Sequence, residues 1–67
     1  MKLYEIRIAN VKKTHLDIAI DRFGWHDANI DWWNYNAGCT LTVKSNTNEI
    51  DRFDKMLNKP SRVKEIS

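Results

Sequence analysis

Residues that commonly fix the chemistry or the shape of a small protein are scarce in this chain. Cysteine occurs once, at Cys39, so no disulfide can form within the chain. A lone cysteine at an alternating apolar position is expected to be a small buried hydrophobe rather than a reactive thiol. Glycine occurs twice and proline once, which excludes flexible Gly-rich linkers and Pro-rich tracts. We therefore predict a single domain over residues 1–67.

Long hydrophobic runs are also absent. No apolar stretch approaches the roughly 20 residues that cross a bilayer, and charges at Lys2, Glu5 and Arg7 make the N-terminus unlike the apolar segment of a signal peptide. We expect a soluble cytoplasmic protein without a membrane partner. The net charge of +2 excludes an acidic mimic of DNA and falls short of a strongly basic nucleic-acid binder. The many Asn, Ile, Lys and Asp residues, which have AT-rich codons, favour a phage or mobile-element protein in a host cytoplasm.

Alternation of apolar and polar residues predicts four strands, over residues 3–11, 28–35, 39–44 and 62–67. The turn chemistry of residues 36–38 joins the second and third strands into a hairpin. On each strand the residues at every second position are predicted to face the core: Tyr4, Ile6, Ile8, Ala28, Ile30, Trp32, Cys39, Leu41, Val43 and Val63.

Apolar spacings of three and four residues predict two helices between these strands. The first begins at Thr14, whose hydroxyl would cap it, and closes at Gly24. The second begins after Asn46, which is spaced to cap with Glu49, and ends before Pro60. The helical residues predicted to pack in the core are Leu16, Ala19, Ile20, Phe23, Ile50, Phe53 and Leu57.

The element order strand, helix, strand, strand, helix, strand predicts an α+β fold of βαββαβ type. Two helices would cover one face of a four-stranded antiparallel sheet, with the first and third strands central. The whole chain resembles the ferredoxin-like superfold. Within it, Phe23-Gly24-Trp25 to Asn29-Ile30-Asp31 and the run from Leu57 to Ile66 are similar to the helix-to-strand joins of ACT-type regulatory domains. That resemblance implies a small-molecule sensor as one alternative function.

Families of this fold that carry out chemistry use the loop after the first strand, which here reads Asn10-Val11-Lys12-Lys13. The loop lacks the two cysteines of heavy-metal-binding domains, the glycine-rich phosphate loop of acylphosphatase-like enzymes and the glycine of the ACT ligand site. His15 is predicted to face solvent in the first turn of the first helix, and His26, in a loop between Trp25 and Asp27, has no Ser or Cys nucleophile predicted near it. We therefore expect no enzymatic activity, no metal and no cofactor.

Aromatic residues gather between residues 25 and 35. Because neighbours on a strand point to opposite faces, Trp32 is predicted in the core, and Trp33 and Tyr35 on the open face of the sheet near its edge. Exposed aromatic side chains beside basic ones are typical of the centres of protein interfaces. The alternative is that they only shield the sheet backbone from water. The candidate protein-binding residues are Trp33, Tyr35, Arg7, Lys44 and Lys64.

The sequence therefore favours a non-catalytic binding module that occludes a larger host protein, as a phage-encoded inhibitor of a host defence system would. The main alternative is a small RNA- or DNA-binding domain that uses the open sheet face. RNA-recognition-motif domains share this topology but carry aromatics on their central strands, where this chain has Glu5, Arg7, Thr40 and Thr42. A homodimer that pairs through the edge strand 28–35 is a further prediction.

Overall fold

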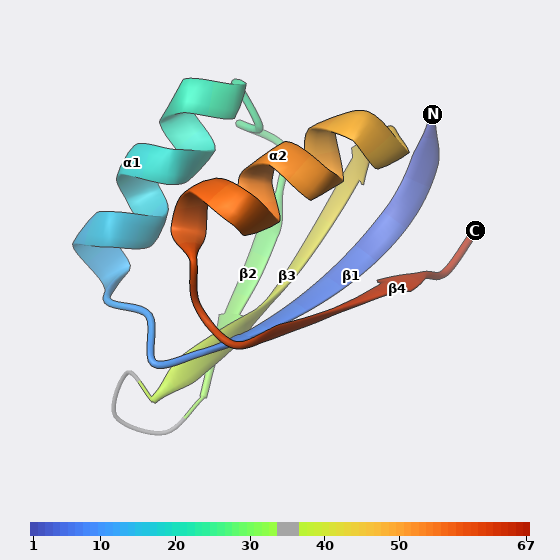
Figure 1. Cartoon of the computed structure of the whole chain (residues 1–67). Coiled ribbons are helices and arrows are strands. Elements are labelled where there is room, and N and C mark those ends of the chain that lie inside the picture. The colour runs from blue at the N-terminus through green and yellow to red at the C-terminus, as the bar shows by residue number, and fades with distance from the viewer. Residues whose placement is uncertain (34–36) are drawn as a thin grey trace.

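The sheet is built around the N-terminal strand. In a computed structural model, which describes residues 1–33 and 37–67, β1 (Lys2–Ala9) pairs antiparallel with β3 (Gly38–Ser45) and with β4 (Ser61–Glu65). The short strand β2 (Asn29–Trp32) adds to the other side of β3, again antiparallel. The resulting order β2-β3-β1-β4 confirms that the first and third strands are central (Figure 1).

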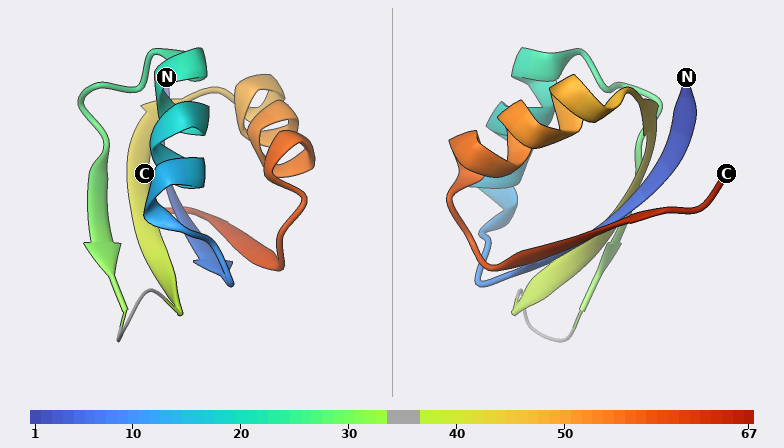
Figure 2. Two further views of the ribbon diagram at one scale, coloured as in Figure 1. Left: turned by 90° about the vertical axis from the view of Figure 1, so that its left-hand side faces the viewer. Right: turned by 45° about the vertical axis from the view of Figure 1, so that its right-hand side comes forward.

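Both helices lie on the same face of this sheet. Helix α1 (Lys13–Phe23) follows β1 and helix α2 (Thr47–Leu57) follows β3, and the described residues place no helix on the other sheet face (Figures 1 and 2). This two-layer arrangement in βαββαβ order is the predicted α+β, ferredoxin-like fold. Each helix has 11 residues, and neither is long and apolar enough to cross a membrane.

The helix ends agree with the sequence predictions in three of four cases. The Asn46 side chain accepts a hydrogen bond from the Glu49 backbone N–H at 2.9 Å, as its capping spacing predicted. Gly24 closes α1 in the left-handed conformation at φ 67°, and α2 ends before Pro60. The prediction that Thr14 caps α1 was wrong. The Lys12 carbonyl already accepts from the Leu16 N–H at 3.0 Å, so the helix includes residue 13 and begins without a side-chain cap.

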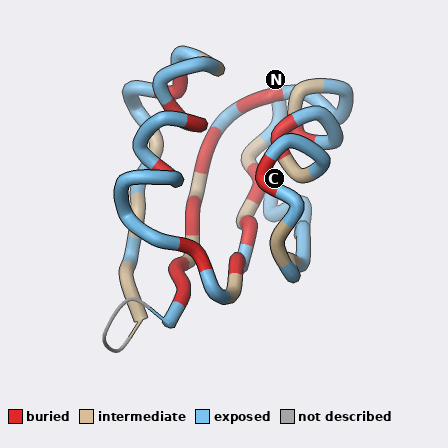
Figure 3. Tube along the Cα trace, turned by 60° about the vertical axis from the view of Figure 1, so that its left-hand side comes forward, coloured by how far each residue is buried: buried red, intermediate tan, exposed pale blue. Residues whose placement is uncertain are grey.

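The core fills the space between the helices and the inner face of the sheet. Buried positions occur on the central strands and on the sides of the helices that face them (Figure 3). The apolar residues buried there are Tyr4, Ile6, Ile8, Val11, Leu16, Ala19, Ile20, Trp25, Cys39, Leu41, Val43, Ile50, Phe53 and Leu57. Cys39 is among them, which confirms its interpretation as a small buried hydrophobe. Ala28, Ile30, Trp32 and Phe23 pack against this cluster while partly buried.

Trp25 is the main core residue that periodicity missed. The sequence placed it in a loop, yet its side chain is only 6% exposed. The Gly24 N–H donates to the Asp21 carbonyl and the Trp25 N–H to the Ile20 carbonyl, each at 3.1 Å. This pair of bonds is the Schellman helix end, which folds the next apolar residue back against the helix. The Trp25 ring then lies 4.6 Å from the Phe53 ring, centre to centre.

The two outer strands depart from the prediction in burial and length. Val63 pairs opposite the buried Ile6, so it points to the inner face as predicted. It remains 44% exposed, because β4 is an edge strand whose inner face is largely solvent-accessible. On the other side, the described part of the second strand ends at Trp32, and Tyr35 lies outside the described residues.

Candidate functional site

The sheet face opposite the helices, here called the open face, presents polar and basic side chains. Pairing registers place Glu5 and Arg7 of β1 beside Thr42 and Thr40 of β3. They also place Lys64 and Arg62 of β4 beside the same two β1 residues. Trp33 continues the pairing of β2, because its N–H donates to the Gly38 carbonyl at 2.8 Å. The open face therefore joins residues from both ends of the chain.

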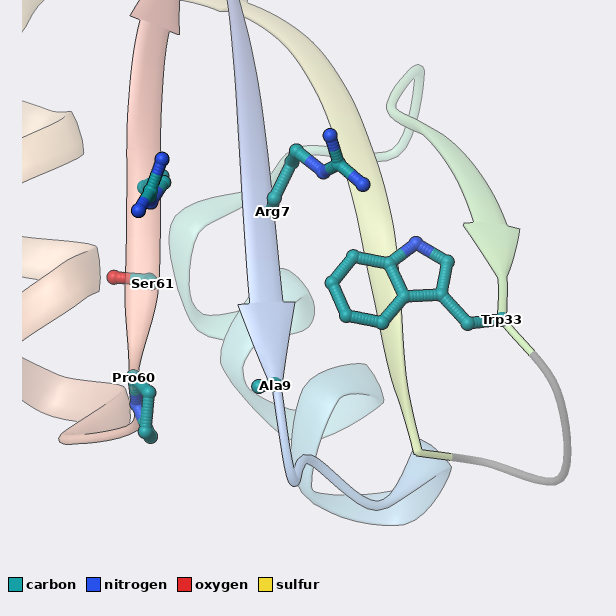
Figure 4. A pocket seen from close by; sticks show the side chains of 6 residues that line it. Arg7, Ala9, Trp33, Pro60 and Ser61 are labelled. Atoms are coloured by element: carbon teal, nitrogen blue, oxygen red, sulfur yellow. The ribbon is translucent and has the colours of Figure 1, made fainter.

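The Trp33 indole lies across β3 rather than pointing away from the sheet (Figure 4). Its Nε1–H donates to the Thr40 hydroxyl at 2.9 Å. The ring also covers Gly38, where an added Cβ would lie 2.7 Å from two carbons of the Trp33 ring. A large aromatic side chain commonly packs in this way over a cross-strand glycine. The aromatic that the sequence placed at the sheet edge thus reaches a central strand.

Arg7 extends from β1 toward this ring. Its guanidinium carbon lies 5.4 Å from the ring centre, which is within the range of a cation–π contact (Figure 4). At an exposed position such a contact contributes about 0.5–1 kcal/mol. The structure therefore brings together two of the predicted site residues, Trp33 and Arg7.

A shallow pocket of about 440 Å³ adjoins the Trp33–Arg7 pair. It is lined by Arg7, Ala9, Trp33, Pro60, Ser61 and Arg62. Ala9 and Pro60 supply apolar contact, the indole forms an aromatic wall, and two guanidinium groups supply hydrogen-bond donors with fixed positive charge. This set of residues suits the binding of an anionic group next to an apolar or planar one.

The remaining predicted site residues lie elsewhere. Lys64 is on the open face opposite Glu5, two residue pairs along the strands from Arg7, and it does not line the pocket. Lys44 lines a second pocket, of about 580 Å³, beside the connection between α1 and β2. Tyr35, the last of the predicted site residues, lies outside the described residues.

Arg62 is the charged pocket residue that the candidate set omitted. It pairs directly opposite Arg7 across β1 and β4. Alternation within the last strand places it on the open face, but only the register of β4 against β1 reveals its neighbour. That register depends on where the chain turns after α2, which periodicity alone does not fix.

Groups that could support catalysis are buried or dispersed in the described structure. Cys39 is fully buried, and burial raises the pKa of its thiol from 9.0 to about 11. The thiol is therefore protonated and inaccessible at neutral pH. Within residues 1–33 and 37–67, no three His, Cys, Asp or Glu side chains cluster closely enough to hold a metal ion. His15 and His26 are both exposed and lie outside the pocket.

Comparisons with protein-family models and with curated proteins found no match for this chain. Because a fold of this kind supports many unrelated functions, the functional interpretation depends on the residues of the open face.

Proposed function

We propose that this chain is a non-catalytic protein-binding module that docks a larger protein through the open face and acts by covering the partner's own site. The observation that carries the proposal is the ordered pair of Trp33 and Arg7 on a surface that the core does not need. Trp and Arg are the residues that most often dominate binding energy at protein interfaces. Their contact beside a pocket is therefore a suitable anchor.

The conformation of Trp33 supports this role. The hydrogen bond to Thr40 and the contact with Gly38 restrict the side chain before any partner arrives. Ordering a flexible side chain on binding costs about 0.5–1.5 kcal/mol. An indole that is already ordered avoids most of that cost.

The charge of the open face specifies the partner's chemistry. Its basic side chains outnumber its acidic ones, which are Glu5 and Asp31. A complementary partner surface is acidic, since opposite potentials speed association and disfavour wrong partners. The basic side chains of the open face are Arg7, Lys44, Arg62 and Lys64.

The biological role we propose is inhibition of a host defence protein by a phage or mobile-element product. It is supported by the AT-rich codon usage that the amino-acid composition implies and by the occluding mode of action. An occluding inhibitor needs only a few well-placed anchors, and the open face supplies two.

A nucleic-acid-binding domain is the second candidate function. The observation in its favour is the position of the Trp33 ring over a central strand and beside Arg7, where a base could stack. Glu5 and Asp31 oppose it, because they interrupt the positive charge along which a chain of phosphates would run.

The test is to capture binding proteins with the tagged chain and to measure the affinity of each captured protein for four variants. We expect Trp33→Ala to weaken binding by at least about 2 kcal/mol, roughly 30-fold. Ile18→Ala is the matched control, because Ile18 is a 57% exposed apolar residue on α1, away from the open face. Its affinity should stay within about twofold of the parent.

Two further variants separate binding from folding. Trp33→Phe keeps an aromatic ring over Gly38 and should fold normally with intermediate affinity. Trp32→Ala removes a side chain that packs against the core and should lower the melting temperature. Binding that is lost in Ile18→Ala but retained in Trp33→Ala would move the docking surface to the helices and contradict the proposal.

A further inference from the structure

Arg7 and Arg62 form a like-charged pair across β1 and β4, here called the arginine pair. Their residues are direct partners in the antiparallel register, and both side chains point to the open face because the alternating neighbours of Arg7, Ile6 and Ile8, are buried. Like charges directly opposite each other on one sheet face are destabilising. The next pair of these two strands on the open face is Glu5 with Lys64, which is complementary. The arginine pair is thus a local exception.

No carboxylate of the described residues neutralises this pair. The ion pairs within residues 1–33 and 37–67 are Lys2 with Glu65 and Lys13 with Asp17, and neither includes an arginine. Asp31 of β2 pairs with Thr40 of β3, and Thr40 in turn pairs with Arg7 of β1. Two strand spacings therefore separate the backbones of Asp31 and Arg7, which is about 10 Å. The two positive charges therefore face a shared pocket without an internal counter-ion.

The walls of the pocket favour the binding of an anion there over its hydration in bulk water. The indole of Trp33 lies on one side, and Ala9 and Pro60 add apolar surface. Apolar walls lower the local dielectric constant and strengthen a charge-assisted hydrogen bond. Two guanidinium groups offer planar sets of donors that match the oxygens of a carboxylate or a phosphate.

We infer that the arginine pair and the Trp33 wall form an oxyanion-binding subsite that receives a carboxylate from an acidic segment of the partner protein. The inference rests on the proposed function in taking that partner to be a protein. A carboxylate fits better than the phosphates of a nucleic acid, because Glu5 and Asp31 on the same face would repel the neighbouring phosphates of a chain.

The first experiment is an NMR titration of the ¹⁵N-labelled protein that follows the Nε–H signals of Arg7 and Arg62 and the Trp33 indole N–H. The probes are inorganic phosphate, as a simple oxyanion, and a short Gly/Ser peptide with one glutamate, with its glutamine counterpart as the blank. We expect saturable shifts of all three signals with phosphate and with the glutamate peptide only. Shifts that grow linearly without saturation would overturn the subsite.

Charge-removal variants identify the residues responsible. Arg7→Gln and Arg62→Gln should each weaken the apparent affinity for both probes at least tenfold. Arg22→Gln is the matched control, because Arg22 is an exposed arginine in the last turn of α1, away from the open face, and it should change the affinity less than twofold. Equal weakening in Arg22→Gln and Arg62→Gln would show a diffuse charge effect and contradict the assignment.

Melting temperatures test the repulsion within the arginine pair independently of any ligand. Arg62→Glu places an acidic side chain opposite Arg7, so it should raise the melting temperature in ligand-free buffer while abolishing the phosphate shifts. Lys64→Glu places an acidic side chain opposite Glu5 and should lower the melting temperature. A lower melting temperature for Arg62→Glu would contradict the unneutralised pair.

The nature of the ligand is resolved by a third probe, an eight-nucleotide single-stranded oligothymidylate. Binding at least tenfold tighter than the glutamate peptide, at the same three N–H signals, would overturn the carboxylate assignment in favour of nucleic acid. If the probes saturate the pocket but no captured protein depends on Trp33, the subsite stands and the proposed function fails. If captured proteins depend on Trp33 but the probes do not saturate, the subsite alone fails.

Discussion

Gly38 is the residue on which the shape of the open face depends. A Cβ at this position would lie 2.3 Å from the Ile8 carbonyl oxygen and 2.7 Å from the Trp33 ring. We expect Gly38→Ala to destabilise the protein by about 1–3 kcal/mol through overpacking and to displace the indole. Urea denaturation measures the first effect, and the Trp33 indole NMR signal reports the second.

The control for this prediction is Gly24→Ala. Gly24 has a left-handed backbone conformation, at φ 67°, but a Cβ there meets no atom within 4 Å. Its replacement should cost about 1 kcal/mol through backbone strain alone and leave the Trp33 signal in place. A Gly38→Ala variant with an unshifted indole signal would contradict the close contact.

Cys39 makes stability depend on pH at the alkaline end. Burial raises the pKa of its thiol from 9.0 to about 11, so the unfolded chain releases this proton at lower pH than the folded one. The stability that the neutral thiol confers is complete below pH 9 and is lost as the pH rises toward 11, by about 2–3 kcal/mol. Urea denaturation between pH 8 and 11 should show this loss, and a Cys39→Ala variant should show a smaller one. Equal pH dependence in both proteins would contradict it.

Among the elements, helix α2 contributes the central side chain of the core. Phe53 is fully buried, and its ring lies 4.6 Å from the Trp25 ring and 5.4 Å from the Phe23 ring, centre to centre. Phe53→Ala should destabilise by about 3–5 kcal/mol, which approaches the whole stability expected of so small a domain. Met56→Ala, on the exposed side of the same helix, should have a much smaller effect. An unchanged melting temperature for Phe53→Ala would contradict the core assignment.

The elements also show what the sequence could and could not predict. Both helices and the inward positions on β1 and β3 follow from periodicity, because each is a local pattern. The strand order follows from the order of the elements and from the right-handedness of crossover connections. Trp25 lies just beyond Gly24, where the helical period ends, and only the hydrophobic contact of a Schellman helix end could have placed it. The Arg7–Arg62 pairing depends on the register between two strands from opposite ends of the chain.

The candidate site was predicted in part for the same reason. Alternation correctly placed Trp33 on the open face and Trp32 against the core. It could not show that the ring leans across β3, since that requires knowing that Gly38 is its partner in the register. A glycine at the start of a strand, opposite an aromatic across a hairpin, is the signal that could have indicated it.

For the whole molecule, the two sheet edges have different chemistry. Two copies that paired antiparallel about Val63 of β4 would bring Arg62 of each copy opposite Lys64 of the other, and charged side chains of this kind block edge pairing. Self-association through β4 is therefore disfavoured.

The predicted homodimer is therefore expected to pair through the other edge of the sheet, which is formed by β2. Sedimentation at tens of micromolar is expected to show a species of twice the 7.9 kDa chain mass, and it should be equally abundant in an Arg62→Thr, Lys64→Thr variant. A single 7.9 kDa species in the parent would contradict dimerisation.

The closeness of the Ile8 carbonyl to Gly38 leaves no room for a Cβ. It therefore distinguishes a residue that the fold requires from residues that only binding would require. Gly38 is required by the backbone itself, so a descendant of this chain keeps it whatever it binds. Arg7, Trp33 and Arg62 lie outside the core, so they can be substituted without loss of the fold if the proposed partner is lost. A descendant with Gly38 but without these three would be expected to keep the fold and to lack the proposed binding site. Joint retention of all four positions among descendants would support the proposed interaction.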